Sequence, residues 1–170
     1  KWAEFAIKQD SSYNFKDYDY KQNKDYIHLG LDCSGYIGWL LYNIFQDKGY
    51  VDFSRKIANN LATENKGKVK KAKYITEYKA GDIMSGENVS HVWLSLGQCF
   101  DGSVVILHSS PAGVHISGTP TPKGAENSQA IKLANKYMGK YYPVWNKKYP
   151  VKPFDYLGKY SQFRWYDNVL

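Results

Sequence analysis

A helical spacing of apolar residues begins at Cys33. Five apolar side chains follow the i, i+3, i+4, i+7, i+8 pattern that buries one face of a helix, namely Ile37, Leu40, Leu41, Ile44 and Phe45. Asp32 is a residue type that caps helix N-termini, and Gly49 is one that ends helices. The pattern therefore predicts a helix over about residues 33–48.

A second pattern, strict alternation, begins at residue 90 and predicts a strand over 90–96. Its two faces carry His91, Trp93 and Ser95 on one side and Val92, Leu94 and Leu96 on the other. Asp101-Gly102 is a hairpin turn signal, and residues 103–108, rich in Val and Ile, are the expected returning strand.

The turn sets an expected register for this hairpin. Pairing the strands about Asp101-Gly102 puts His108 opposite Ser95, and therefore on the face of His91. In that simple register the two histidines are two pairs apart. A bulge near Gly97 would change their separation, and the sequence leaves this open.

Weaker patterns complete the order of elements. Helices are expected at about 2–9, 53–63 and 125–138, and short strands at 83–84, 114–116 and 161–166. The lysine-rich residues 66–73 and the proline-containing residues after Gly139 are expected to be loops. Because helices precede a hairpin-rich sheet, the expected class is α+β with an antiparallel sheet, in a single domain covering residues 1–170.

The charge of the chain is basic, at +7 from 23 basic and 16 acidic residues. Such a surplus attracts polyanions, including nucleic acid, anionic lipid and cell-wall polymers, and it equally serves general solubility. Arg55 and Arg164 are the only arginines, and no nucleic-acid-binding motif accompanies the lysines. We expect no nucleic-acid partner and, from the apolar runs, no membrane span.

Aromatic residues are concentrated near the C-terminus, where eleven lie between Tyr137 and Tyr166. Such rings either build part of a core or line a cleft that suits sugars or peptides. The sequence leaves both interpretations open.

Cys33 is the strongest candidate for chemistry. At the predicted start of a helix, the positive end of the helix dipole and unpaired backbone N–H groups lower a thiol pKa. The small residues Ser34 and Gly35 leave room for a substrate at the sulfur, and the same N–H groups can hold the oxyanion of an acyl-transfer intermediate. A structural thiol is the alternative that Cys33 alone leaves open.

A thiolate nucleophile needs a base, and the chain has four histidines: His28, His91, His108 and His115. A sheet face that presents His91 and His108 to the helix of Cys33 would form a Cys-His-His triad. One histidine would be the base and the other would hold its tautomer. For each histidine alone, a structural role is the alternative.

Metal binding by Cys33, His91 and His108 is disfavoured because no metal-ligand spacing supports it. We expect neither a metal nor a cofactor. Cys99 lies between the predicted strand and its turn, so we expect it to be a structural thiol that does not pair with Cys33.

Four short motifs, in order, resemble the NlpC/P60 family of papain-like cysteine peptidases, and together they span about residues 26–116. They are Asp32-Cys33-Ser34-Gly35-Tyr36 around the nucleophile, Ala80-Gly81-Asp82-Ile83 entering the sheet, Ser90-His91-Val92 with the basic histidine, and Leu107-His108-Ser109-Ser110 with the third polar residue. The resemblance implies a papain-like NlpC/P60 fold in which the nucleophile helix packs on an antiparallel sheet.

The same resemblance implies a cysteine endopeptidase that hydrolyses the peptide stems of bacterial peptidoglycan, often between γ-D-glutamate and a diamino acid. His91 would take the proton of Cys33, and the resulting thiolate would attack the scissile amide while His108 orients His91. Backbone amides at the helix start, around Cys33 and Ser34, would hold the oxyanion. Tyr26 would take the role of the family tyrosine that polarises the substrate carbonyl.

The implied enzyme is a monomer that is secreted or associated with the cell wall, with its signal or anchor outside this chain. Its lysines would hold it on anionic wall polymers. Three alternatives stay open on the same fold: an amidase that separates the stem from the sugar, an acyl transferase, and a non-catalytic wall-binding module. Two features depart from the family pattern, because Tyr26 lies only seven residues before Cys33 and the interval between His91 and His108 is long.

Overall fold

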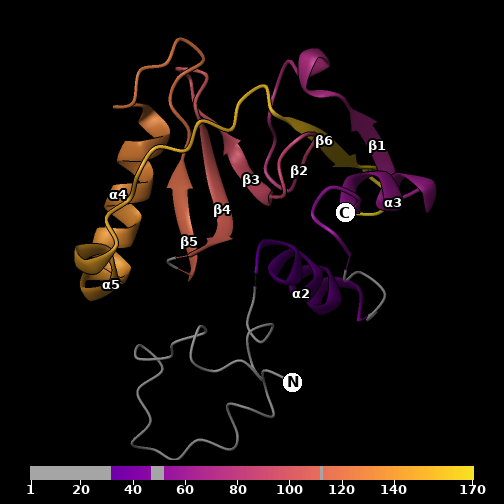
Figure 1. Cartoon of the computed structure of the whole chain (residues 1–170), viewed down its shortest axis with the longest axis horizontal. Helices are drawn as coiled ribbons and strands as arrows, with labels where there is room; N and C mark the ends of the chain where they lie inside the picture. Colours follow the sequence, from indigo (N-terminus) through magenta and orange to yellow (C-terminus); the bar gives the residue numbers. More distant parts are fainter. Residues whose placement is uncertain (1–31, 47–51, 112) are drawn as a thin grey trace, which may run out of the picture. The chain divides into compact units, whose positions relative to one another are not determined.

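The computed structural model describes residues 32–46, 52–111 and 113–170, which belong to one compact unit, Asp32–Leu170 (Figure 1). The helix expected at 2–9 and Tyr26 lie outside the described residues. The expectation of one domain over residues 1–170 therefore stays a prediction.

The centre of this unit is an open, antiparallel sheet with the strand order β1-β6-β2-β3-β4-β5. The strands are β1 (Gly67–Lys70), β2 (Ile83–Gly86), β3 (Val92–Gln98), β4 (Val104–Ser110), β5 (Gly113–Gly118) and β6 (Tyr160–Trp165). This arrangement, with the helices described next, confirms the α+β class and the antiparallel sheet.

Two strands differ from the sequence prediction. β1 occupies part of the lysine-rich stretch that was expected to be a loop, because Lys68 and Lys70 alternate with the half-buried Val69. Lysines on an edge strand also discourage pairing with other chains. β6 was expected as a strand, but its position was not. It lies between β1 and β2 rather than beside β5, the strand that precedes it in the chain.

The helices are α2 (Cys33–Phe45), α3 (Ile57–Thr63), α4 (Gln129–Tyr141) and α5 (Pro143–Lys148), with a short 3-10 helix, η4 (Ala72–Tyr74). The predicted start of α2 at Cys33 is confirmed, but the helix ends at a left-handed Gln46 rather than at Gly49. α5 corrects the prediction of irregular chain after Gly139, because Pro143 stands in the first turn, where a proline is tolerated. None of the described helices has the length and apolar character needed to cross a membrane.

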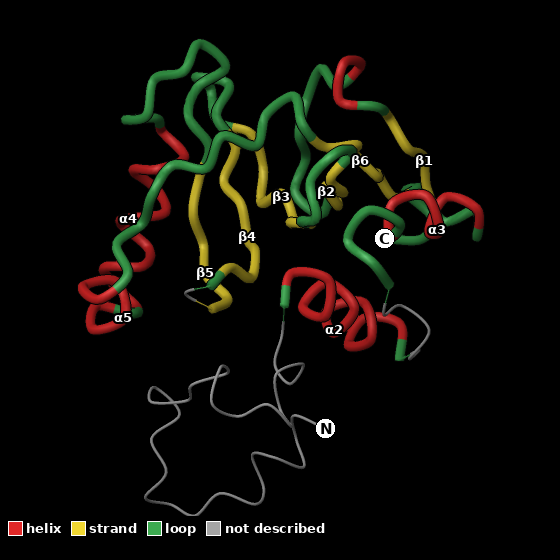
Figure 2. Tube along the Cα trace, in the orientation of Figure 1, coloured by secondary structure: helices red, strands yellow, loops and turns green. Residues whose placement is uncertain are grey.

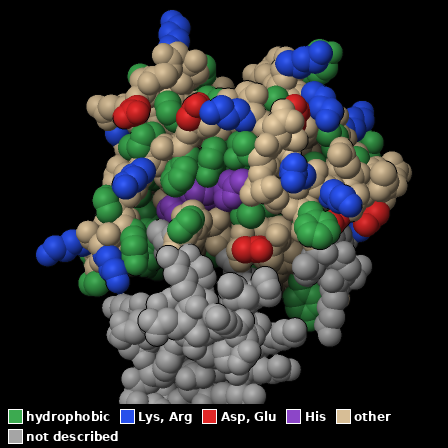
Figure 3. All heavy atoms as spheres, in the orientation of Figure 1, with side chains coloured by type: hydrophobic (Ala, Val, Ile, Leu, Met, Phe, Trp, Pro, Cys, Tyr) green, Lys and Arg blue, Asp and Glu red, His purple; other side chains and the backbone are tan. Residues whose placement is uncertain are grey.

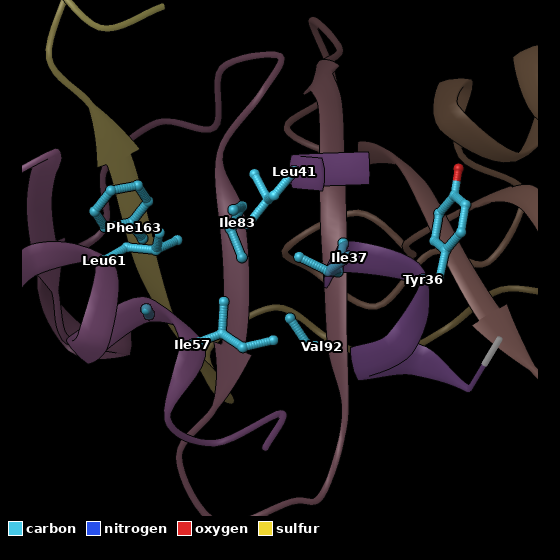
Figure 4. Packing of buried hydrophobic residues seen from close by; sticks show 9 residues of the cluster. Tyr36, Ile37, Leu41, Ile57, Leu61, Ile83, Val92 and Phe163 are labelled. Atoms are coloured by element: carbon cyan, nitrogen blue, oxygen red, sulfur yellow. The ribbon is translucent and has the colours of Figure 1, made fainter. Parts of the chain in front are cut away.

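One face of the sheet packs against α2 and α3. Their buried residues meet Ile83, Val92 and Phe163 of three neighbouring strands, and Figure 4 shows the side chains of both helices directed at these strands. Ile37 and Leu41 are 1% and 3% exposed. The apolar stripe predicted from the helical period is therefore what attaches α2 to the sheet.

The opposite face packs against irregular chain rather than a helix. Trp93 and Tyr160 lie in a second buried cluster, with Phe154 and Tyr156 packed against it. The C-terminal aromatic segment thus builds part of the core, which is one of the two interpretations that the sequence left open.

The far end of the sheet order, at β4 and β5, is covered by α4, and α5 packs on α4 (Figures 1 and 2). The approach is close at Gly118, where an added Cβ would meet the backbone of Ala130 at 2.8 Å. A glycine here lets the helix lie directly on the strand.

Candidate active site

Cys33 is the first residue of α2, and Asp32 caps the helix. The Asp32 carboxylate accepts hydrogen bonds from the Gly35 N–H at 2.6 Å and from the Ser34 hydroxyl at 3.0 Å. The N–H groups of Cys33 and Ser34, by contrast, are directed so that they stabilise negative charge on the Cys33 sulfur. The local sequence thus places two backbone donors at the half-buried thiol.

A third backbone N–H reaches this sulfur from the sheet. Gly86 donates to the His91 carbonyl, so the backbone polar groups of His91 face β2 and those of Val92 face β4. The paired residues of β3 and β4 extend only to Leu94 and Leu107. Beyond that point the N–H of Val92 lies against the Cys33 sulfur and lowers its pKa.

The register of the hairpin brings His91 and His108 closer than the simple prediction. Ser95 pairs with Ile106 instead of His108, because two one-residue shifts add: the turn pairs Gln98 with Val104 instead of Val105, and a bulge lies between Ser95 and Gly97. Gly97 has φ +119°, a conformation that favours glycine. Continued along the strands, this register makes the two histidines diagonal neighbours, at a Cβ separation of about 7–8 Å that aromatic side chains can span.

The two imidazoles are in contact, and their shared sheet face is confirmed. His91 Nε2 and His108 Nδ1 are 3.1 Å apart, and the rings meet edge to face with centroids 5.3 Å apart. His108 is fully buried, whereas His91 is partly exposed. The inner ring is therefore enclosed by protein, whereas the outer ring is open to solvent.

The relation of this face to the helix differs from the prediction. α2 packs on the sheet face of Val92 and Leu94, whereas His91 and His108 belong to the face of Trp93. Strand alternation requires this difference. Cys33 nevertheless meets this strand near His91, because its sulfur lies against the N–H of Val92, the residue that follows His91.

Two tyrosines that the sequence did not single out connect the histidines with the thiol. The Tyr156 ring lies 5.3 Å from the His91 ring, and its hydroxyl is 3.5 Å from His108 Nδ1. Tyr160 lies 6.4 Å from the His91 ring. A charge on Cys33 raises the pKa of both tyrosine hydroxyls, as does burial, so these rings lie near the sulfur as well.

His115 is a further site residue that sequence reasoning did not place. It pairs directly with His108 across β4 and β5, and their Nε2 atoms are 3.2 Å apart. A signal was present, because counting back from the tight turn between Ser110 and Gly113 sets these two histidines opposite each other. Figure 3 shows the histidine side chains side by side among hydrophobic ones.

Burial sets the resting charges of the site. It raises the pKa of the Cys33 thiol, although the backbone N–H groups act in the other direction, and the Asp32 carboxylate raises that pKa further. Burial also lowers the pKa of His91, and it lowers the pKa of His108 to about 3. The resting pair is thus a neutral thiol and a neutral imidazole, unlike the thiolate and imidazolium of the sequence hypothesis.

Two cavities lie beside the histidines of the site, and His115 and Trp145 line both. The larger, about 440 Å³, is bounded by α2, β5, α4 and α5, and its aromatic residues are Tyr36, Tyr137, Tyr142 and Trp145. The smaller, about 280 Å³, includes Phe154 and Lys152. Part of the C-terminal aromatic segment therefore lines open space, so both interpretations of that segment hold in part.

The remaining predicted site residues are placed as follows. Ser34 is half-buried beside Cys33, and Tyr26 lies outside the described residues. Cys99 is a free thiol, as is Cys33, and it follows β3 at the end opposite His91. Within residues 32–46, 52–111 and 113–170, no group of three or more His, Cys, Asp or Glu side chains is arranged to hold a metal ion.

Comparisons with protein-family models, curated proteins and solved structures found no match to this chain. The geometry of the site therefore carries the functional argument by itself.

Proposed function

We propose that this protein is a cysteine peptidase in which Cys33 is the nucleophile, His91 the base and His108 the residue that orients the base. The observation that carries the proposal is a free thiol at the start of a helix, against the N–H of Val92, the strand residue that follows a histidine in contact with a second, buried histidine. Purely structural thiols do not need such neighbours.

The proposed reaction begins with the neutral pair. His91 Nε2 faces His108, which leaves His91 Nδ1 for the thiol proton. As that proton moves to His91, the sulfur attacks the scissile carbonyl carbon, and the imidazolium that forms is stabilised by its contact with His108. His91 then gives the proton to the leaving amine, and water hydrolyses the thioester by the same steps in reverse.

The oxyanion of each tetrahedral intermediate would be held by backbone N–H groups. Those of Cys33, Ser34 and Val92 already stabilise negative charge at the sulfur, and an oxyanion on the attacked carbon forms next to it. Loss of a single oxyanion donor typically costs a factor of about 10²–10³ in rate. Tyr26 remains a proposed contributor outside the described residues.

The proposed substrate is the peptide stem of bacterial peptidoglycan, cut within the stem at a γ-D-glutamyl–diamino acid bond, and the motifs around Cys33, His91 and His108 support it. A secreted or wall-associated location belongs to the same proposal. The aromatic cavity beside His115 offers rigid rings to a stem or its sugar.

Mass spectrometry of soluble muropeptides tests this proposal. We expect fragments split within the stem after incubation with the parent protein, and a loss of about 10⁴-fold or more in rate for Cys33→Ala, because nothing replaces the nucleophile. Release of whole stems from the sugar would change the assignment to an amidase. Transfer of the stem to an added amine would change it to an acyl transferase.

Cys99→Ala is the matched control, since Cys99 is also a free, half-buried thiol but follows the far end of β3, about 20 Å along the strand. It should cleave like the parent. Equal activity of Cys33→Ala and the parent would disprove the assignment of Cys33 as nucleophile. If both proteins bind the wall and neither releases products, the protein is a binding module.

A further inference from the structure

His91, His108 and His115 form a continuous row of three imidazoles that ends on the backbone. His91 Nε2 lies 3.1 Å from His108 Nδ1, and His108 Nε2 lies 3.2 Å from His115 Nε2. His115 Nδ1 in turn lies 2.9 Å from the Gly113 carbonyl oxygen. Neighbouring rings of the row thus meet nitrogen to nitrogen, and the Tyr156 hydroxyl lies farther from His108 Nδ1, at 3.5 Å.

The backbone end of the row fixes its direction. A carbonyl oxygen only accepts hydrogen bonds, so His115 must carry its proton on Nδ1 and donate it to Gly113. A neutral His115 then has a lone pair on Nε2, and His108 must donate from its own Nε2. His108 Nδ1 is left as an acceptor, so His91 donates from Nε2 and keeps its lone pair on Nδ1.

We propose that His115 is a positioning residue of the candidate active site, which fixes the base tautomer of His91 by way of His108. This inference rests on the proposed peptidase function. His115 touches no reacting atom in this scheme. It acts by giving the buried His108 an acceptor for Nε2–H.

The reversed arrangement of protons is unfavourable. It would put a His115 Nδ1 lone pair against the Gly113 carbonyl oxygen, two acceptors at hydrogen-bond distance. It would also put the proton of His91 on Nδ1, the nitrogen that faces away from His108, and the base would be lost. Burial lowers the pKa of all three rings, which keeps them neutral and makes the donor–acceptor order strict.

Packing holds the row in place. The His108 and His115 rings are 4.5 Å apart, and Phe154 packs edge to face on His108 at 4.6 Å. Trp145 packs on His115 at 5.1 Å. The Tyr156 hydroxyl lies 3.5 Å from His108 Nδ1, and this nitrogen is a hydrogen-bond acceptor in the proposed arrangement.

Nitrogen NMR of the intact protein, labelled in its histidine rings, tests the proton positions directly and without substrate. The parent should carry the ring proton on Nδ1 of His115 and on Nε2 of His108 and His91, with each ring assigned by single substitution. A parent His91 that is protonated on Nδ1, or evenly on both nitrogens, would overturn the inference.

Two substitutions test the dependence on His115. In His115→Phe, His108 loses its acceptor, so His91 should populate the Nδ1–H form. Alkylation of Cys33 by iodoacetamide should then slow about 10-fold or more. This lies within the loss of about 10⁴-fold that a wrong base tautomer causes. His115→Gln reaches the same place with an amide oxygen and should restore both readouts. All rates are measured in the Cys99→Ala background, so that one thiol reacts.

The outcomes separate this inference from the proposed function. Unchanged His91 tautomer and alkylation rate in His115→Phe would overturn the role of His115 even if muropeptides are cleaved. The expected tautomers without muropeptide cleavage would support the row and contradict the peptidase. If His115→Phe does not fold, the tautomers of the parent protein and the two readouts of His115→Gln still test the role of His115.

Discussion

At the scale of single residues, groups around the Cys33 thiol shift its pKa in opposite directions. Backbone N–H groups favour the thiolate of Cys33, whereas burial and the Asp32 carboxylate, which is required as the helix cap, disfavour it. The cap was readable from the sequence, because capping depends on neighbouring residues. The burial was not, because Tyr156 and Tyr160 come from the far end of the chain. The net effect is a raised pKa, which keeps the resting Cys33 thiol neutral, and in the proposed mechanism its activation is left to His91.

The buried His108 predicts a specific loss of stability in acid. Its folded-state pKa of about 3 lies below the ordinary 6.5, so the unfolded chain binds the proton first. The stabilising effect of this neutral ring is fully present above pH 6.5 and declines as the pH falls toward 3. Between pH 7 and pH 5 the free energy of unfolding should fall by about 2 kcal/mol more in the parent than in His108→Gln. Urea unfolding at both pH values measures this, and parallel losses in the two proteins would contradict it.

At the scale of elements, the bulge of β3 and the position of β6 assemble the site. Without the bulge at Gly97, the pairing of Gln98 with Val104 would continue to a pairing of Leu94 with His108, and the His108 ring would lie on the opposite sheet face from His91. The predicted common face holds because the one-residue shifts at the turn and at the bulge together leave the face unchanged, and a hydrophobic pattern encodes neither shift. The insertion of β6 beside β2 likewise depends on contacts between distant residues, and it is what brings the preceding Tyr156 to the histidines.

The attachment of β6 centres on Asp82, which is 2% exposed. The Arg164 guanidinium donates to both of its carboxylate oxygens, at 2.8 and 2.7 Å, and Gln162 donates at 2.9 Å. Asp82 belongs to the Gly-Asp motif at the entrance of β2, and the Trp165 indole donates to the Gly81 carbonyl at 3.1 Å. The motif therefore has a structural role here, as the anchor of the C-terminal strand.

Arg164→Ala should lower the free energy of unfolding by about 3 kcal/mol, because it leaves a buried carboxylate without its charge partner. Lys159→Ala is the matched control, since its ion pair with Asp155 is exposed and should contribute less than about 1 kcal/mol. Chemical denaturation of the two variants measures the difference. Equal losses would show that the Asp82 network does not hold β6.

At the scale of the whole molecule, the charge of +7 comes almost entirely from lysines on the surface. Four exposed lysines, Lys68, Lys70, Lys71 and Lys73, lie on or next to β1. Four more, Lys132, Lys136, Lys147 and Lys148, lie together with Lys140 on α4 and α5. Because the two groups lie on elements at opposite ends of the sheet order, we expect charge to act over the whole surface rather than at one patch.

Binding to cell-wall sacs that retain their anionic polymers should therefore weaken strongly between about 0.1 M and about 1 M salt, where the Debye length falls from about 10 Å to about 3 Å. Replacing either group of four lysines by glutamine should weaken binding to a similar degree. A sedimentation assay with the Cys33→Ala protein measures binding without cleavage. Equal binding to sacs stripped of anionic polymers, or no response to salt, would contradict the electrostatic role.

The sequence by itself determined the features that neighbouring residues control. These are the start of the helix at Cys33, its Asp32 cap and the alternation that puts His91 on the face of Trp93, since capping and periodicity act over a few residues. The tertiary structure decided which rings touch. The turn and the bulge set the distance between His91 and His108, strand pairing added His115, and the segment before the inserted C-terminal strand supplied Tyr156. Those contacts depend on pairing and packing between residues far apart in the chain, which no local pattern specifies.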